Sequence, residues 1–472
     1  MKYQPVIGVE IHCELLTDSK VFCSCKNEFG GEENTRVCPV CSGMPGALPM
    51  LNQQAVILAA KAGLCSGCTI NNYSAFDRKN YFYPDSPKAY QITQFEYPIC
   101  KDGYIEISNK KVRINRIHIE EDAGKLIHDD KNGVSVIDYN RCGVPLIEIV
   151  TEPDFSSASE VCEFVEQLAL RLKYCEVCDA KMEQGSLRVD VNISIMPVGS
   201  NELGTRAEIK NLNSFKSITK AIEYEISRQS EVLDKGGRVI QETRRFDDSS
   251  NTTSSLRSKE EAHDYRYFPE PDIPPIIISD KSISDLQHSL PELPHIRYKR
   301  YTDEYGLSED DAMLIINSKA FSDFYDDAVK HNPDYKSIAS MMLVEVNRNL
   351  NNNNMCIEDV CFTPKDIAQL AKMVSDGVVS KNTAKDILKI MFLNGENPLD
   401  IANKNGYIMS NDTNAAEEII DSLFRQNPQL VRDYKNGSEK IFGYFMGQAM
   451  RTVGKSANPA TVREILIKKL NQ

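Results

Sequence analysis

The spacing of apolar residues divides this chain into a part with strand periodicity and a part with helical periodicity. Before about residue 292, apolar and polar residues alternate with a period of two in several segments, which is typical of strands with one buried face. These segments are 5–15, 112–121, 134–139, 144–151 and 186–195. Helical patterns lie at about 52–66, 156–174 and 214–233. Beyond residue 292 only helical patterns remain, so we predict an α+β fold with a largely antiparallel sheet, followed by helical domains.

Two interruptions mark the expected domain boundaries. The Pro-rich stretches "FPEPDIPPIIISD" and "SLPELPH" end the strand-rich part near 268–295, and "NKNGYIMSNDT" interrupts the helices near 405. A chain of 472 residues is long enough for several domains. We therefore predict domains over residues 1–291, 292–405 and 406–472.

The charge distribution limits how this chain can bind nucleic acid. The formal net charge of −13 argues against a protein that coats nucleic acid without specificity. The segment from Asn436 to Gln472 has six Lys or Arg residues and two Glu residues, a local charge of +4. This suits a local nucleic-acid contact, although a solvated helical face has the same composition. Because no run of about 18 apolar residues and no leader sequence is present, we predict a cytoplasmic protein without a membrane span.

Four of the fourteen cysteines have the spacing of a zinc knuckle. In "FCSCKNEFGGEENTRVCPVC", twelve residues separate the first close thiol pair from the second, across a loop that contains glycine. This spacing predicts a structural zinc ion held by Cys23, Cys25, Cys38 and Cys41. Two further C-x-x-C pairs lie on or beside helical patterns, and we interpret them as packing thiols: Cys65/Cys68 and Cys175/Cys178.

The strand pattern "GVEIHCEL", Gly8 to Leu15, places Glu10, His12 and Glu14 on one face and apolar residues on the other. A solvated surface strand shows the same alternation. Carboxylates beside an imidazole are also suitable ligands for a divalent ion.

Further acidic strands favour the second interpretation. A strand ends in Glu120, Glu121 and Asp122, another presents Arg188, Asp190 and Asn192 on one face, and a third presents Glu208 and Lys210. A rigid loop from Phe76 to Gln94 carries Arg78, Lys79 and Lys88, which are cations suited to phosphate. No P-loop follows a strand and no G-x-S-x-G or amidase stretch is present. We therefore predict a sheet whose polar face holds metal and triphosphate.

Six blocks of this sequence resemble the B subunits of bacterial tRNA-dependent amidotransferases, the GatB family of the GatCAB complex. The blocks are "FDRKNYFYPDSPKAYQITQ", "DYNRCGVPLIEIVTEPD", "MEQGSLRVDVNIS", "AEIKNLNSF", "QETRRFD" and "DYRYFPEPDIPP". The resemblance continues into "YKNGSEKIFGYFMGQAM", which is similar to the YqeY-type end of the family, so it covers essentially the whole chain.

The resemblance implies a cradle-shaped, glutamine-synthetase-like catalytic domain, a helical domain and a YqeY-like tail that contacts tRNA. It implies a carbon–nitrogen ligase with glutamine as amido donor, which uses ATP and Mg²⁺ to phosphorylate the side chain of Glu-tRNA(Gln) or Asp-tRNA(Asn). Ammonia from the glutaminase subunit, GatA, would then displace the phosphate and give Gln-tRNA(Gln) or Asn-tRNA(Asn). The expected assembly is a heterotrimer with GatA and GatC.

The resemblance also suggests roles for single residues. The expected magnesium ligands are Glu10, His12, Glu121 and Glu208. Asp190 and Asn192 are expected behind them or at a second metal, and Lys79 and Lys88 at phosphate or at the ammonia channel. Arg78 and Arg188 are expected to pair with carboxylates of the site.

Two other functions remain open at this stage. A non-catalytic tRNA-docking subunit would need cations rather than clustered acids. A ligase of free amino acid and ammonia would need no basic helical tail. The sequence does not distinguish the two misacylated tRNAs as substrates.

Overall fold

The structure is a computed structural model that describes residues 2–108, 110–129, 132–258, 265–409, 413–435, 438, 440–453 and 459–471. The chain forms two compact units, Met1–Pro294 and His295–Gln472. The predicted mixed α+β class is confirmed, because strands and helices alternate in the first unit and the described part of the second unit is helical. The predicted division into three domains stays a prediction. No helix within the described ranges is long and apolar enough to cross a membrane.

A nine-stranded sheet forms the centre of the first unit, in the order β14-β13-β12-β11-β1-β10-β7-β6-β2. Its strands are β1 (Tyr3–Glu14), β2 (Thr69–Ile70), β6 (Cys100–Ile107), β7 (Lys110–Glu121), β10 (Pro145–Thr151), β11 (Leu187–Pro197), β12 (Ala207–Leu212), β13 (Glu242–Asp247) and β14 (Thr252–Ser258). Neighbouring strands run antiparallel except β12 and β13, which are parallel. The predicted antiparallel pattern is therefore largely correct.

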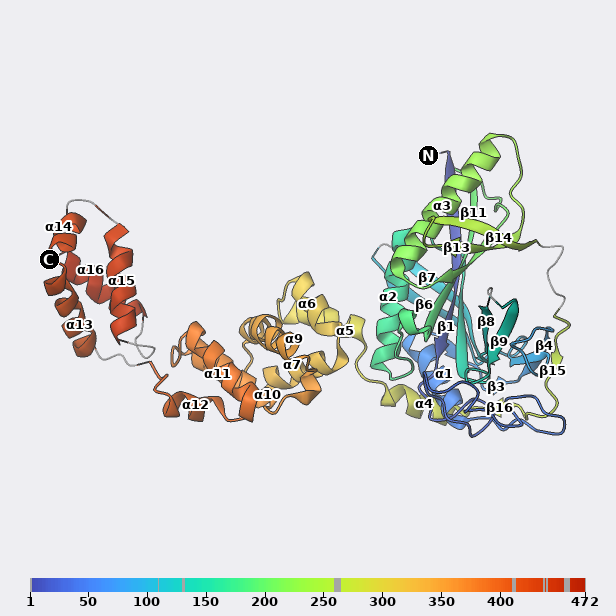
Figure 1. Ribbon diagram of the computed structural model, residues 1–472, viewed down its shortest axis with the longest axis horizontal. Coiled ribbons are helices and arrows are strands. Elements are labelled where there is room, and N and C mark those ends of the chain that lie inside the picture. Colours follow the sequence, from blue (N-terminus) through green and yellow to red (C-terminus); the bar gives the residue numbers. More distant parts are fainter. Residues whose placement is uncertain are drawn as a thin grey trace. The chain divides into compact units, whose positions relative to one another are not determined.

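Three helices cover the apolar face of this sheet: α1 (Gln53–Cys65), α2 (Ala158–Tyr174) and α3 (Phe215–Asp234). They contact β7, β6 and β11 respectively. In Figure 1, α2 and α3 lie to one side of the long strands. The core between the two layers includes Ile11 and Val191 of the sheet and Phe164 of α2, all buried. The opposite face of the central strands is therefore free to carry polar groups.

The short strands within residues 77–93, 125–138 and 268–269 lie on the side of the long strands away from α2 and α3 (Figure 1). Strands β4 (Asp77–Asn80), β5 (Tyr90–Thr93) and β15 (Phe268–Pro269) form a three-stranded sheet in the order β15-β4-β5. Strand β8 (Lys125–Asp129) pairs with β9 (Val134–Asp138), and β3 (Tyr73–Ser74) pairs with β16 (Ile276–Ile277). A 3₁₀ turn, Met182–Gln184, precedes β11, and α4 (Asp280–Ser289) ends this unit.

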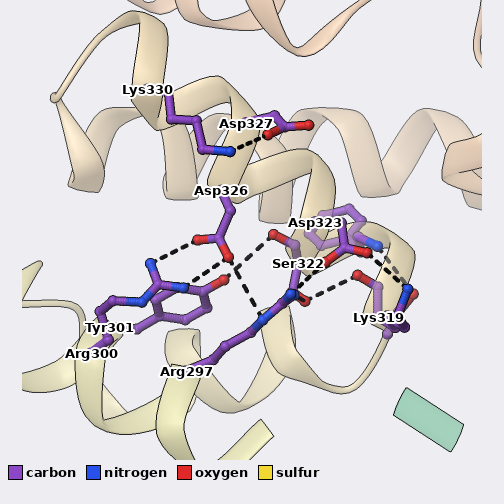
Figure 2. Close-up of polar contacts among 11 residues, drawn as sticks. Arg297, Arg300, Tyr301, Lys319, Ser322, Asp323, Asp326, Asp327 and Lys330 are labelled. Carbon is purple, nitrogen blue, oxygen red and sulfur yellow. Dashed lines mark hydrogen bonds and ion pairs between the residues drawn. The ribbon is translucent and has the colours of Figure 1, made fainter. Parts of the chain in front are cut away.

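The second unit consists of short helices in the described part of the chain. The first group is α5 (Pro294–Lys299), α6 (Glu309–Ile316), α7 (Lys319–His331), α8 (Tyr335–Ser340), α9 (Asn347–Asn353), α10 (Pro364–Ser375), α11 (Lys381–Asn394) and α12 (Pro398–Lys404). Ion pairs join the start of this group to α7: Arg297 lies 2.6 Å from Asp323, and Arg300 lies 2.9 Å from Asp326 (Figure 2). These buried or half-buried pairs fix α5 and the π-helical turn Arg300–Glu304 against α7.

The remaining helices have an apolar core of their own. They are α13 (Thr413–Gln426), α14 (Pro428–Lys435), α15 (Lys440–Val453) and α16 (Pro459–Leu470). Ile420, Phe445 and Leu466 are completely buried in this core. Helical periodicity in the last part of the sequence therefore reflects real packing.

Candidate active site

The polar face of the central strands is built around β1. β1 lies between β10 and β11, so His12 is directly opposite Glu148 on one side and Arg188 on the other. Glu10 is opposite Asp190 of β11. Cross-strand partners share a face of an antiparallel pair, and this face is the one opposite buried Val9 and Ile11. Residues distant in the sequence therefore meet as polar clusters.

The first cluster, which we call the His12 cluster, consists of His12, Glu120 and Glu148. The Nε2 atom of His12 lies 3.6 Å from a carboxylate oxygen of Glu120 and 3.7 Å from one of Glu148. One ligand atom of each residue lies within 4.8 Å of the others, a spacing that suits a shared ion. An imidazole with two carboxylates suits a divalent metal.

His118 supports this cluster from the neighbouring position on β7. Its Nε2 atom lies 3.2 Å from Glu148 and 3.8 Å from Glu120. Burial lowers the pKa of His118, but the Glu148 and Glu120 carboxylates outweigh burial and raise it to about 9. Against the opposing effect of burial, the charge of His118 holds the pKa of Glu148 below its usual range. The pair therefore favours an ionised carboxylate at the centre of the cluster.

The second cluster, which we call the Glu10 cluster, consists of Glu10, Asp190 and Glu208. Their ligand oxygens lie within 4.8 Å of one another. Burial raises the pKa of Glu10, and the charges of Glu148, Glu208 and Asp190 raise it further. Such crowding of carboxylates is unfavourable without a cation. An all-oxygen donor set is the kind that Mg²⁺ prefers.

Hydrogen bonds and one lysine hold the Glu10 cluster in place. Lys210 Nζ lies 2.9 Å from Glu208 and 3.3 Å from Asp190. Asn192 donates a hydrogen bond of 2.9 Å to Glu10, and Thr243 donates one of 2.9 Å to Glu208. The side chains are therefore oriented before any ligand arrives.

The four expected magnesium ligands do not form one group among the described residues. Glu10 and Glu208 share one cluster, His12 belongs to the other, and Glu121 belongs to neither. Glu121 instead pairs with Lys88 and accepts a hydrogen bond of 2.9 Å from the backbone N–H of Ile92. Consecutive strand residues point to opposite faces, so Glu120 rather than Glu121 reaches the polar face. The role of Glu121 as a magnesium ligand stays a prediction.

Three other expected residues lie on strands β4 and β11. Lys79 lies 4.8 Å from the ring of Tyr265; burial opposes its positive charge, but Glu120 and other neighbours raise its pKa above the usual value. Arg188 pairs with Asp122 at 2.8 Å and Arg78 pairs with Glu270 at 2.6 Å. The functional assignments of these residues stay predictions.

Sequence reasoning did not select Glu120 as a candidate ligand, and it did not single out Glu148 or His118. Glu148 lies in the apolar run "PLIEIV", where a lone carboxylate among apolar residues was the available signal. Its importance depends on the register that places it opposite His12. Strand pairing of this kind cannot be derived from periodicity alone.

The four thiols of the knuckle converge as their spacing predicts. One sulfur atom from each of Cys23, Cys25, Cys38 and Cys41 lies within 4.8 Å of the others. The ammonium of completely buried Lys20 lies 3.6 Å from Cys41 Sγ and donates a hydrogen bond of 2.8 Å to the carbonyl of Arg36. A buried cation needs a nearby anion, and metal-bound thiolates supply one. The residues present therefore fit a zinc ion.

This knuckle touches the loop that carries Lys88. Cys142 Sγ donates a hydrogen bond of 3.2 Å to the carbonyl of Cys41. A Cβ atom on Gly43 would lie only 2.8 Å from Lys88 Cγ. The remaining C-x-x-C thiols are all buried and agree with a packing role: Cys65, Cys68, Cys175 and Cys178.

This chain has an α+β domain with carboxylate clusters on its sheet, and a helical unit follows it in the sequence. A family model described as the GatB/GatE catalytic domain matches residues 5–284, and one described as the GatB domain matches residues 323–470. The class is therefore that of GatB/GatE proteins.

Relatives that match over the full length identify the family more specifically. The aspartyl/glutamyl-tRNA(Asn/Gln) amidotransferase B subunit of Ruminiclostridium cellulolyticum is 52% identical over 476 residues, covering 100% of this chain and 98% of the relative. The protein of the same name from Thermoanaerobacter pseudethanolicus is 49% identical, with 100% of each chain covered. The chain belongs to the family of tRNA-dependent amidotransferase B subunits, and the resemblance of its sequence blocks is confirmed.

Proposed function

We propose that this chain converts Glu-tRNA(Gln), Asp-tRNA(Asn) or both into the amidated forms, as a ligase that consumes ATP and receives ammonia from a glutaminase subunit. The names of its full-length relatives support the tRNA substrates. The observation that carries the chemistry is the pair of carboxylate clusters on one face of β1. A tRNA platform without catalysis would have no need for clustered acids, which repel phosphate.

The reaction needs two displacements. A side-chain carboxylate oxygen attacks the γ-phosphorus of ATP, the bond to the β-phosphate oxygen breaks, and ADP leaves. Ammonia then attacks the acyl carbon, inorganic phosphate leaves, and the nitrogen loses a proton. The first displacement is required because ammonia does not expel oxide from a carboxylate.

The His12 and Glu10 clusters are our proposed sites for Mg²⁺, which would neutralise the charge of the phosphates when bound. This chain's own cations would orient the substrates. Lys79, whose pKa Glu120 and Glu148 raise, would pair with a phosphate oxygen. Lys88, which pairs with Glu121, would contact phosphate or line the ammonia route.

The proposed assembly contains the A and C subunits of the family, and the tail over 406–472 is our proposed tRNA contact. Its basic residues include Arg451 and Arg463, both exposed or partly exposed, while Lys455 lies outside the described residues. Zinc in the knuckle is proposed as structural support. The cytoplasm is the expected compartment.

The test is amide formation on both misacylated tRNAs, with ATP, Mg²⁺ and free ammonia, in the complex with an inactive glutaminase. Glu148→Gln and Asp190→Asn each disable one cluster, and Glu106→Gln, at an exposed position of β6, is the matched control. We expect both cluster variants to lose at least about 100-fold in amide formation while tRNA binding persists. A wild-type complex that binds tRNA without hydrolysing ATP would indicate a docking subunit. Amidation of free glutamate would indicate a ligase of small substrates.

A further inference from the structure

A cavity of about 600 Å³ opens on the polar side of the first unit. Its walls come from the β2–β3 turn, the loop after β5, and strands β6 and β7. The volume is that of a small-molecule pocket. None of its lining residues belongs to the His12 or Glu10 clusters.

The cavity lies one strand repeat from His118, which is directly opposite Glu148 of the His12 cluster. Arg116 lines it, and Arg116, His118 and Glu120 alternate along β7, so they share the polar face. Side chains two residues apart on a strand are separated by about 7 Å. A ligand in the cavity can therefore extend a second group to the cluster.

Two cations meet on the floor of the cavity. Lys101 of β6 is directly opposite Arg116 of β7. Like charges in this position are unfavourable, and neither residue forms an ion pair within the described ranges. The Nε atom of Arg116 is also buried without a hydrogen-bond partner. Glu96 and Asp102 also line the cavity, but Lys101 and Arg116 are direct cross-strand partners, so an anionic group is favoured between these two cations.

Aromatic rings form the other part of the wall. Tyr73, Phe95 and Tyr97 are 47%, 49% and 45% exposed, which is high for rings that serve only packing. Phe95 stacks on Tyr267 with centroids 4.3 Å apart, and Tyr73 meets Tyr97 edge to face at 5.3 Å. Half-exposed rings beside Arg and Lys are the arrangement that binds unpaired bases with their phosphates.

The wall is fixed before a ligand binds. Asn71 donates a hydrogen bond of 2.9 Å from its backbone to Ile99 and one of 2.7 Å from its side chain to Pro98. The side chain of Asn72 donates a hydrogen bond of 2.9 Å to the carbonyl of Ile278. These contacts tie the turn to the loop after β5 and to β16, so little ordering is required on binding.

We propose that this cavity binds an adenine nucleotide unit, with the base on the rings of Phe95, Tyr73 and Tyr97 and a phosphate at Lys101 and Arg116. The inference rests on the proposed function, in which two participants carry adenosine next to the reacting group: ATP and the 3′ end of the aminoacyl-tRNA. Both present the same base and sugar to the cavity, and both place their reacting group at the neighbouring cluster.

The experiment compares Phe95→Leu and Arg116→Gln with wild type in the full complex. Phe95→Tyr keeps the ring and should restore binding. Phe82→Leu, at a ring that is 89% exposed and outside the cavity, and Lys111→Gln, on β7 beyond it, are the matched controls. KM is measured for ATP at saturating aminoacyl-tRNA, and for aminoacyl-tRNA at saturating ATP. Thermal unfolding of each variant checks that the fold is intact.

We expect Phe95→Leu and Arg116→Gln to raise one of the two KM values about tenfold, with the controls unchanged. A rise confined to ATP assigns the cavity to ATP, and a rise confined to tRNA assigns it to the acceptor end. Unchanged values for both substrates in an active complex would overturn the cavity assignment and leave the proposed function standing.

Direct filter-binding measurements distinguish a failure of the cavity assignment from a failure of the proposed function. ATP with Mg²⁺, intact deacylated tRNA and tRNA trimmed of its 3′-terminal adenosine are each bound to wild type and to Phe95→Leu. If wild type forms no amide, the proposed function fails. A tenfold loss of ATP or intact-tRNA binding in the variant would then still support the cavity, whereas equal binding would overturn it.

Discussion

At the scale of a single residue, Glu225 shows how a buried charge couples stability to pH. This completely buried residue of α3 lies 2.8 Å from Arg228 and 3.0 Å from Arg244 of β13. Burial raises the pKa of Glu225, but hydrogen bonds from Arg228 and Thr253 outweigh it, so the pKa lies below its usual value. Its stabilisation is therefore present above the unfolded pKa of about 4.3 and is lost as pH falls through the lower folded value.

We expect Glu225→Gln to lower the free energy of unfolding by about 3 kcal/mol at pH 7, because buried Arg244 and half-buried Arg228 each lose a carboxylate partner. The difference from wild type should shrink as the pH is lowered from 5 to 3. Urea unfolding at several pH values measures it, and Glu231→Gln on the exposed side of α3 is the control. A pH-independent difference would contradict the electrostatic explanation.

At the scale of the element, the knuckle and the loop before β5 act as one packed piece. Gly43 and Gly46 both have positive φ, +68° and +85°, but only Gly43 approaches Lys88. We expect Gly46→Ala to lower the free energy of unfolding by about 1 kcal/mol through backbone strain alone. Gly43→Ala should lower the free energy of unfolding further than Gly46→Ala does. It should also reduce amide formation about tenfold or more, because it displaces Lys88.

Denaturant unfolding, zinc content and amide formation are measured for both glycine variants. Gly46→Ala is the internal control, since a Cβ there meets nothing within 4 Å. Equal activity in the two variants would show that the contact with Lys88 has no functional role.

Prediction from sequence succeeded where local periodicity decides the structure. Strands β1, β7, β9, β10 and β11 and helices α1, α2 and α3 all lie within a few residues of their predicted positions. Convergence of the four knuckle thiols also follows from spacing. The division of the acidic residues into two clusters cannot be predicted from spacing, because it depends on which strands become neighbours. Glu148 meets His12 only through long-range pairing of β10 with β1.

At the scale of the whole molecule, the proposed tRNA contact lies in the last helices. Deletion of residues 406–472 should raise the KM for aminoacyl-tRNA and make tRNA affinity less sensitive to salt, because fewer phosphates are neutralised. ATP hydrolysis should persist, since the clusters lie in the first unit. Filter binding between 50 and 200 mM salt is the measurement. An unchanged salt slope would contradict a tRNA role for the tail.

Glu10 and His12 are two residues apart on β1, yet each belongs to a different cluster. A strand holds such neighbours about 7 Å apart, whereas paired metal ions that share bridging ligands lie about 3.5–4 Å apart. If both clusters bind ions, the backbone of β1 sets the spacing between Glu10 and His12, which would hold them. Glu10 with Asp190 and Glu208 would then hold one ion and His12 with Glu120 and Glu148 the other, so a substitution at either position of β1 would remove a ligand from one ion only.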